Sequence, residues 1–284
     1  AYEEIPLGDI NCGISFKETP AVSTPGKYRE IQAEIMPHAQ RLARLLKPLF
    51  SPRREDAMSG LRRGLLDPSE VWRLPKLGDN AVFERRNQPS HRLDVAVFFL
   101  IDQSGSMVSA EKYLHAQRAT ALLAEALSLL KVPFAAVSFS ASQGKPLVNH
   151  FRVIGWGSDD FSRIPSIRYM GYNRDGYSIR VAANELLRRR EKVRVLFVMS
   201  DGKPNHPANA YVHSRGVNDT RLAVKEATKR GLIVQGVLAS KNGSDQEAAR
   251  IIYPNLLVVE DFARLPDQIA YKMRHLLNKF KERG

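Results

Sequence analysis

The stretch Asp94–Met107, DVAVFFLIDQSGSM, decides the fold. Its apolar run, residues 95–101, carries β-branched and aromatic side chains and is too short for a useful helix, so it predicts a fully buried parallel strand. The strand runs directly into Asp102, Ser104 and Ser106. In α/β sheets, ligands bind at the carboxyl ends of strands, at a topological switch point. One carboxylate and two hydroxyls there form a set of hard oxygen ligands suited to Mg²⁺ or another small divalent cation.

A second stretch has the same design. The buried strand predicted at 193–199 ends in Ser200-Asp201-Gly202, so an apolar run is again followed by an acid and a glycine. A simpler interpretation of the first stretch remains open, in which Asp102 caps a helix after a Ser/Gly turn.

Short apolar strands alternate with helical patterns along the rest of the chain. This order predicts an α/β fold with a doubly wound, mostly parallel sheet flanked by helices, in the manner of Rossmann folds. Asp219 is expected to cap a helix that Gly231 ends. The other strands are expected at 133–139, 150–154, 232–239 and 256–259, and the other helices at 113–131, 176–190, 245–252 and 266–280.

The N-terminal part is predicted to be an extension of this domain. Residues 1–26 show no sustained period and are expected to form an irregular arm. Residues 27–50 carry one apolar helical stripe that Pro37 interrupts, which predicts a kink or two consecutive helices. We therefore expect an arm and helical extension over 1–90 and the domain with the site over 91–284. Within this extension, residues 27–64 are expected either to pack on the domain or to dock a partner.

Composition sets limits on the function. The chain has 284 residues, a formal charge of +13 and an apolar share of 43%, which is ordinary for a globular protein. Its only cysteine, Cys12, excludes an internal disulfide and favours a reducing compartment, so we expect a cytoplasmic protein without a secretory signal. No apolar run approaches the roughly 18 to 20 residues of a membrane span. Positive charge attracts nucleic acid, anionic membranes and acidic proteins alike.

The Asp-x-Ser-x-Ser pattern after a hydrophobic strand resembles the metal-ion-dependent adhesion site of von Willebrand factor A domains. The resemblance implies that a second loop supplies a Thr about six residues before an apolar helix residue. Counting back from Ile179 gives Asn173 instead, whose amide oxygen is also a hard donor, and Asp175 is the alternative. The resemblance also implies an Asp from a third loop, which Asp201 fits. The implied metal ligands are Asp102, Ser104, Ser106, Asn173, Asp175 and Asp201. The alternative is a site that has lost its metal.

Further motifs narrow the resemblance. The run Ser200-Asp201-Gly202-Lys203-Pro204-Asn205, Asn218-Asp219-Thr220-Arg221 and the earlier Leu66-Asp67-Pro68 are similar to the C-terminal A domain of NorD and CbbO proteins. This resemblance covers about residues 60 to 280. It implies an adaptor that links a MoxR-type AAA+ ATPase to its client, of the nitric oxide reductase or rubisco type, by coordinating a carboxylate of an acidic partner surface. The implied cation is Mg²⁺, with Mn²⁺ and Ca²⁺ as alternatives.

Catalysis is not expected. The sequence contains no phosphate-binding Gly-x-x-x-x-Gly-Lys-Ser/Thr loop, no Gly-x-Ser-x-Gly elbow and no His-Glu-x-x-His helix, so ATP hydrolysis would come from a partner. His206 and His213 are interpreted as surface residues, with metal ligation as the alternative. The competing hypothesis is a basic nucleic-acid-binding or scaffold protein with a vestigial metal site. The charge supports it, whereas the absence of a recognisable reading motif speaks against it.

Overall fold

The computed structural model describes residues 10–50, 58–68, 70–72, 81–85, 94–238, 243–259 and 262–281. The chain divides into two compact units, a main unit of Ala1–Leu46 with Val95–Gly284 and a small unit of Lys47–Asp94. The second boundary lies four residues after the predicted one at residue 90. The first 46 residues, predicted as part of the extension, group with the main unit.

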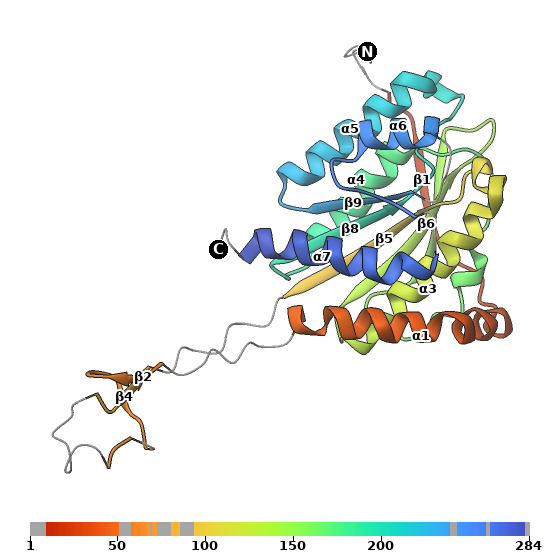
Figure 1. Cartoon of the computed structure of the whole chain (residues 1–284). Helices are drawn as coiled ribbons and strands as arrows, with labels where there is room; N and C mark the ends of the chain where they lie inside the picture. Colours follow the sequence, from red (N-terminus) through yellow and green to blue (C-terminus); the bar gives the residue numbers. More distant parts are fainter. Residues whose placement is uncertain are drawn as a thin grey trace. The chain divides into compact units, whose positions relative to one another are not determined.

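The main unit contains a seven-stranded sheet with the order β1-β7-β6-β5-β8-β9-β10 (Figure 1). Neighbouring strands are parallel except for β6 and β7, which confirms the mostly parallel α/β fold. All residues of the central strand β5 are buried, because both faces of the sheet are covered. The strands are β1 (Ser15–Pro20), β5 (Val95–Asp102), β6 (Phe134–Ala141), β7 (Leu147–Ile154), β8 (Val193–Met199), β9 (Ile233–Leu238) and β10 (Leu256–Val258).

Helices cover both faces of this sheet. One face packs against α4 and α5, which enclose Ala96, Phe98 and Leu100 of β5 in one apolar cluster. On the other side α1, α3 and α7 lie together (Figure 1). The helices are α1 (Pro25–Phe50), α3 (Lys112–Leu129), α4 (Asp175–Leu187), α5 (His213–Lys229), α6 (Gly243–Ile252) and α7 (Leu265–Lys281), with 3-10 helices η1 (Gly105–Glu111), η2 (Ile164–Ser166), η3 (Ala208–Ala210) and η4 (Phe262–Arg264). Among the described helices, none has the length and apolar character needed to cross a membrane.

The N-terminal segment differs from its prediction in two ways. Ser15–Pro20 forms the edge strand β1, parallel to β7, where an irregular arm was predicted. Its residues are mostly exposed, so they lack the apolar pattern that marks a strand. Helix α1 is continuous across Pro37, so the prediction of two consecutive helices is wrong. Ile35 and Ala39 on either side are fully buried, and this packing offsets the backbone hydrogen bond that proline removes.

The start of α5 is a further correction. The helix begins at His213, so Asp219 lies inside it and does not cap it. The carboxylate of Asp219 instead accepts a hydrogen bond from Arg180 of α4 at 2.8 Å. The predicted end is confirmed, because Gly231 has a φ of +88° just after the last turn.

The small unit contains a three-stranded antiparallel sheet with the order β2-β4-β3. Its strands are β2 (Met58–Leu61), β3 (Leu65–Leu66) and β4 (Phe83–Arg85). Leu65, Leu66 and Trp72 are exposed within it.

Candidate metal centre

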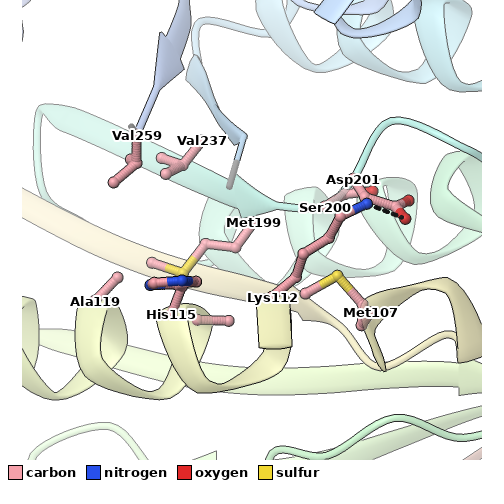
Figure 2. A pocket seen from close by; sticks show the side chains of 10 residues that line it. Met107, Lys112, His115, Ala119, Met199, Ser200, Asp201, Val237 and Val259 are labelled. Carbon is pink, nitrogen blue, oxygen red and sulfur yellow. Dashed lines mark hydrogen bonds and ion pairs between the residues drawn. The ribbon is translucent and has the colours of Figure 1, made fainter. Parts of the chain in front are cut away.

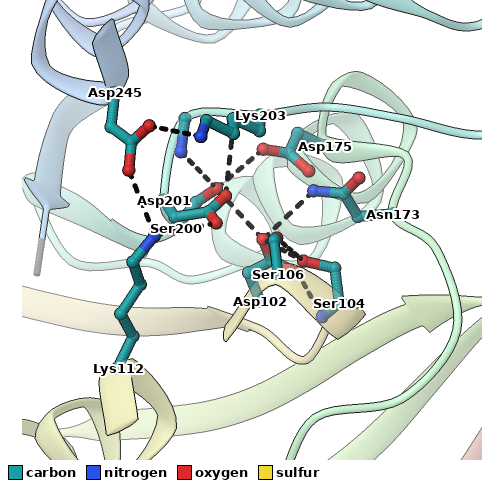
Figure 3. Close-up of polar contacts among 11 residues, drawn as sticks. Asp102, Ser104, Ser106, Lys112, Asn173, Asp175, Ser200, Asp201, Lys203 and Asp245 are labelled. Atoms are coloured by element: carbon teal, nitrogen blue, oxygen red, sulfur yellow. Dashed lines mark hydrogen bonds and ion pairs between the residues drawn. The ribbon is translucent and has the colours of Figure 1, made fainter. Parts of the chain in front are cut away.

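Three segments of the main unit meet at the carboxyl edge of the sheet (Figure 3). β5 and β8 are parallel neighbours with Ile101 opposite Met199, so the next residues, Asp102 and Ser200, lie at the same level. The third segment precedes α4 and joins them through Asn173, whose Nδ2 donates to Asp102 Oδ2 at 3.1 Å. Residues far apart in the sequence therefore share one site.

Asp102 is the centre of this site. Its Oδ1 accepts the backbone N–H of Ser104 at 2.7 Å, and its Oδ2 accepts the Ser104 hydroxyl at 3.0 Å. The Ser104 hydroxyl lies in turn 3.0 Å from that of Ser106. Asp102 and Ser104 are buried, whereas Ser106 is half-buried. The structure therefore brings together the three residues predicted from the Asp-x-Ser-x-Ser pattern, and Ser106 is the most accessible of them.

Asp175 is also part of the site and is fully buried. Its Oδ2 lies 3.0 Å from the Ser200 hydroxyl, which lies 3.2 Å from Asp102 Oδ2 as well. One hydroxyl hydrogen can serve only one of these carboxylates. The other oxygen of Asp175, Oδ1, has no hydrogen-bond partner among the described residues. The hydrogen bonds of the site thus gather on Asp102, and one buried carboxylate oxygen of Asp175 is left without a donor.

Burial and the negative charge of neighbouring carboxylates raise the pKa of both Asp102 and Asp175. Burial raises the pKa of Asp102 to about 7, the negative charge of Asp201 adds to the rise, and hydrogen bonds from Ser104 and Asn173 oppose it. Burial also raises the pKa of Asp175 well above its ordinary value, and the charge of Asp102 adds to the effect. A divalent cation would supply the missing positive charge.

The donors of the site fit such a cation. The hydroxyl of Ser104 lies within hydrogen-bond distance of both Asp102 and Ser106, so these three residues offer neighbouring hard oxygens, and Asp175 adds an oxygen without a partner among the described residues. In the part of the chain that the structure describes, no cluster of three or more His, Cys, Asp or Glu residues could hold a metal ion. A cation here would therefore depend on the serine hydroxyls as well as on the carboxylates.

Asn173 lies in the site in an unexpected orientation. Its amide nitrogen faces Asp102, and its Oδ1 accepts the backbone N–H of Asn205 at 2.7 Å. The N–H of Asn205 can only donate, so this contact fixes which end of the amide faces the carboxylate. Coordination through the amide oxygen stays a prediction, and it would require Asn173 to give up its contact with Asn205.

Asp201 is placed beside these groups, within a cluster of ion pairs. Its Oδ2 lies 3.2 Å from Nζ of Lys112, and its Oδ1 accepts the backbone N–H of Lys203 at 3.2 Å. Lys112 Nζ also lies 3.1 Å from Asp245 Oδ2, and Lys203 Nζ lies 2.6 Å from Asp245 Oδ1. Burial lowers the pKa of Lys112, but Asp201 and Asp245 outweigh this effect, so the pKa is raised overall.

Sequence reasoning missed Ser200, Lys112 and Asp245 as members of this site. Ser200 directly follows the buried strand β8, a position that could have suggested it. Lys112 and Asp245 are 133 positions apart in the sequence, and neither residue lies in a local motif that signals the pairing.

A small apolar pocket adjoins the cluster (Figure 2). The stem of Lys112 forms part of its wall next to Met107 and Met199. The remaining lining residues are His115, Ala116, Ala119, Ser200, Asp201, Val237 and Val259.

Arg174 fastens the N-terminal segment to the site. Its guanidinium is fully buried and lies over the ring of Tyr211, 4.6 Å from the ring centroid. It donates hydrogen bonds to the carbonyls of Ile10 and Ala208 and to Oδ1 of Asn11. Because Arg174 lies between Asn173 and Asp175 in the sequence, these contacts also fix the backbone of the second loop.

One histidine prediction is wrong. His206 is fully buried, with Nε2 3.0 Å from the carbonyl oxygen of Ser142, while its Nδ1 accepts the backbone N–H of Ala208 at 3.2 Å. Burial lowers the pKa of His206, which favours the neutral form that these contacts need. The side chain of His213 lies outside the described residues.

Comparisons with known proteins agree with this architecture. The sequence model of the von Willebrand factor type A domain matches residues 96–270. The chain is 27% identical over 265 residues to the uncharacterized protein YojO of Bacillus subtilis, covering 89% of this chain and 41% of YojO. It is 29% identical over 170 residues to NorD of Stutzerimonas stutzeri, covering 56% of this chain and 27% of NorD. The chain thus spans less than half of either relative.

A solved structure shares the fold. The crystal structure of the vWF domain of the type V pili tip protein Mfa5 from Porphyromonas gingivalis superimposes with a TM-score of 0.50 at 11% identity, covering 65% of this chain and 96% of that domain.

Proposed function

We propose a protein-binding function for this chain, which belongs to the von Willebrand factor type A domain family. The module would capture a carboxylate of its partner through a divalent cation. Asp102, Ser104 and Ser106 would hold the cation, with Asp175 and Asp201 beside them. When bound, the cation would supply an open coordination position for the partner's carboxylate. Mg²⁺ is the proposed ion, with Mn²⁺ and Ca²⁺ as alternatives.

The observation that carries this proposal is the convergence of hard oxygens on a buried carboxyl. Asp102 lies within 3.2 Å of hydroxyl groups from two separate segments, and Asp175 keeps an oxygen without a partner. Burying charged carboxylates is costly unless a cation balances them. A resident divalent cation is the simplest group that would do so.

The surroundings of the site support binding of a protein. Val108, Tyr169 and Met170 are exposed apolar residues near the site. The backbone of Met170 donates to the carbonyl of Gln103 at 2.5 Å, which joins this loop to the Asp-x-Ser-x-Ser segment. Exposed apolar side chains next to a charge-binding centre are typical of protein interfaces.

The proposed partner is a MoxR-type AAA+ ATPase, and the proposed role is that of a cytoplasmic adaptor to a client protein. The similarity to NorD supports this role. The client would be of the nitric oxide reductase or rubisco type, with an acidic surface. We propose binding and no catalysis, so ATP hydrolysis would be the partner's activity.

Metal binding is tested first, by titrating the chain with Mg²⁺ and Mn²⁺ in a calorimeter. We expect one site in the wild type, and at least about tenfold weaker binding in Asp102→Ala and Ser106→Ala, since each loses a charge-bearing or polar ligand. Asp159→Ala is the matched control, because Asp159 is an exposed acid outside the site. Equal binding by wild type and Asp102→Ala would contradict the proposal.

Partner binding is tested by sedimentation with the MoxR-type ATPase of the same genome, with and without EDTA. We expect the complex to be lost with EDTA and in Asp102→Ala, and to survive moderate salt. The alternative, nucleic-acid binding, predicts the reverse: affinity for DNA or RNA that falls steeply with salt and does not respond to EDTA. The basic charge of +13 is the observation that favours this second candidate.

A further inference from the structure

We propose that Lys112 is a positioning residue of the metal centre. Its ammonium would compete with the divalent cation for the carboxylate of Asp201, and this competition would limit the affinity of the site for the cation. This inference rests on the proposed metal-dependent function and goes beyond it by naming a residue that limits metal affinity.

The position of the ammonium is the first argument. Lys112 begins α3, its side chain is 7% exposed, and its Nζ lies between Oδ2 of Asp201 at 3.2 Å and Oδ2 of Asp245 at 3.1 Å. Both aspartates are at most 1% exposed. A buried ammonium is stable only when it is paired, and two carboxylates pair it here. Lys112 is therefore held in place by the fold (Figure 3).

The hydrogen bonds of Asp201 are the second argument. One of its oxygens is used by Lys112 and the other by the backbone N–H of Lys203. The cluster of Asp102, Ser104 and Ser106 is close enough for the charge of Asp201 to act on Asp102. The carboxylate of Asp201 can therefore interact either with the ammonium of Lys112 or with a cation bound beside Asp102.

Competition follows from these two arguments. A cation that draws Asp201 toward Asp102 must weaken the pairing of Asp201 with Lys112. The ammonium also adds positive charge beside the incoming ion, and like charges at short range repel strongly where little water screens them. Both effects lower the affinity for the cation.

A neighbouring lysine provides a matched control. Lys203 carries the same charge, but its Nζ contacts Asp245, and its side chain is 47% exposed. Because water screens it, its removal should change cation affinity little.

The test measures the affinity for Mg²⁺ and Mn²⁺ alone, by calorimetry, in the wild type and three variants. Lys112→Met removes the charge and keeps an apolar stem against Met107 and Met199 in the pocket wall. We expect it to bind the cation about tenfold or more tightly, since 1.4 kcal/mol is tenfold. Lys112→Arg keeps the charge and should stay near the wild type. Lys203→Met should change affinity less than about threefold.

Asp245→Asn tests the opposite direction. It leaves the ammonium of Lys112 to Asp201 alone and removes a negative charge near the site, so we expect cation affinity to fall several-fold. A purely structural role of Lys112 would lower stability in both Lys112→Met and Asp245→Asn, and it would not move affinity in opposite directions. If Lys112→Met does not fold, the test rests on Asp245→Asn alone. Cation binding by Asp245→Asn that is as tight as in the wild type, or tighter, would then overturn the inference.

The outcomes separate this inference from the proposed function. Cation binding that Asp102→Ala abolishes, but that Lys112→Met leaves unchanged or weakens, overturns the role of Lys112 and leaves the metal-dependent function standing. Absence of cation binding in both the wild type and Lys112→Met overturns the two together. Binding that is absent in the wild type and present in Lys112→Met supports the inference most directly.

Discussion

The hydroxyl of Ser200 lies 3.2 Å from Oδ2 of Asp102, which joins the ends of two neighbouring parallel strands by a direct side-chain contact. The same hydroxyl accepts the backbone N–H of Gly202 at 3.2 Å. Ser200 therefore connects the acid of the first loop to the turn that carries Asp201.

Ser200→Ala should destabilise the protein. The change leaves the buried carboxyls of Asp102 and Asp175 with one donor fewer, which costs about 1–3 kcal/mol for an unsatisfied buried group. The loss should be larger at pH 8 than at pH 5.5, because the carboxyls carry more charge there. Urea denaturation at both pH values measures it. Ser158→Ala, in an exposed turn, is the control and should cost less than about 0.5 kcal/mol. Equal losses in the two variants would contradict the assigned role of Ser200.

The pH dependence of stability should reveal Asp102. Burial raises its folded-state pKa from 3.8 to about 7, so the folded chain keeps a proton that the unfolded chain releases in this window. The free energy of unfolding therefore falls as pH rises from about 4 to 7, by at most about 1.4 kcal/mol per pH unit. Asp102→Asn removes this titration.

The measurement is the difference between wild type and Asp102→Asn in urea denaturation with EDTA, from pH 4 to 8. Taking the difference cancels groups that do not interact with Asp102, such as His150, whose pKa burial lowers to about 3. Asp175 does not cancel, because the charge of Asp102 raises its pKa, so the difference reports the two carboxyls together. Saturating Mg²⁺ should reduce the slope, because a cation that binds the ionised site stabilises the folded state at higher pH. A difference that does not vary with pH would show that Asp102 is ionised throughout.

Arg174→Lys should loosen the N-terminal segment. Lysine lacks the planar guanidinium that lies over Tyr211 and reaches Ile10, Asn11 and Ala208 at once. Because hydrogen bonds from a charged donor to neutral acceptors are lost, we expect the free energy of unfolding to fall by about 1.5–3 kcal/mol. Hydrogen exchange should also be faster at residues 10–14. The exposed Arg188 is the control, and Arg188→Lys should leave both measurements unchanged.

Gly176→Ala should be strongly destabilising although alanine favours helices. A Cβ at Gly176 would lie 2.1 Å from Oδ2 of Asp219, which is buried and held by Arg180. Overpacking of this kind costs about 1–3 kcal/mol. Gly26→Ala is the control in another first helical turn, where a Cβ meets nothing within 4 Å, and it should be neutral or stabilising by up to about 1 kcal/mol. The measurement is the thermal unfolding temperature of both variants. A lower temperature for Gly176→Ala but not for Gly26→Ala would show that a Cβ does not fit at Gly176.

Several parts of the fold and site could be predicted from the sequence. Strands β5 and β8 are mostly apolar, with only Arg194 interrupting β8, and each leads within two residues into an acid, Asp102 or Asp201, so the local sequence pattern was enough to predict them. Strand β1 could not be predicted, because a polar edge strand has no apolar alternation and is defined by its partner. The pairing of Lys112 with Asp245 has no local signal either, since it depends on how α3 and α6 are brought together.

Arg174 shows another limit of sequence reasoning. An arginine beside two polar residues suggests a solvated loop, yet it is fully buried. Two of its partners are backbone carbonyls, which every residue carries and which no sequence pattern marks.

The edge strand β1 has a consequence for any shorter version of the chain. Its outer rim carries Lys17, Glu18 and Pro20, features that discourage a further strand from adding to a sheet. A fragment beginning at residue 91 would lack this rim and would leave unpaired the N–H and C=O groups with which β7 binds β1. Such a fragment should exchange strands between molecules or precipitate. The short polar strand Ser15–Pro20 therefore protects the edge of the sheet from self-association.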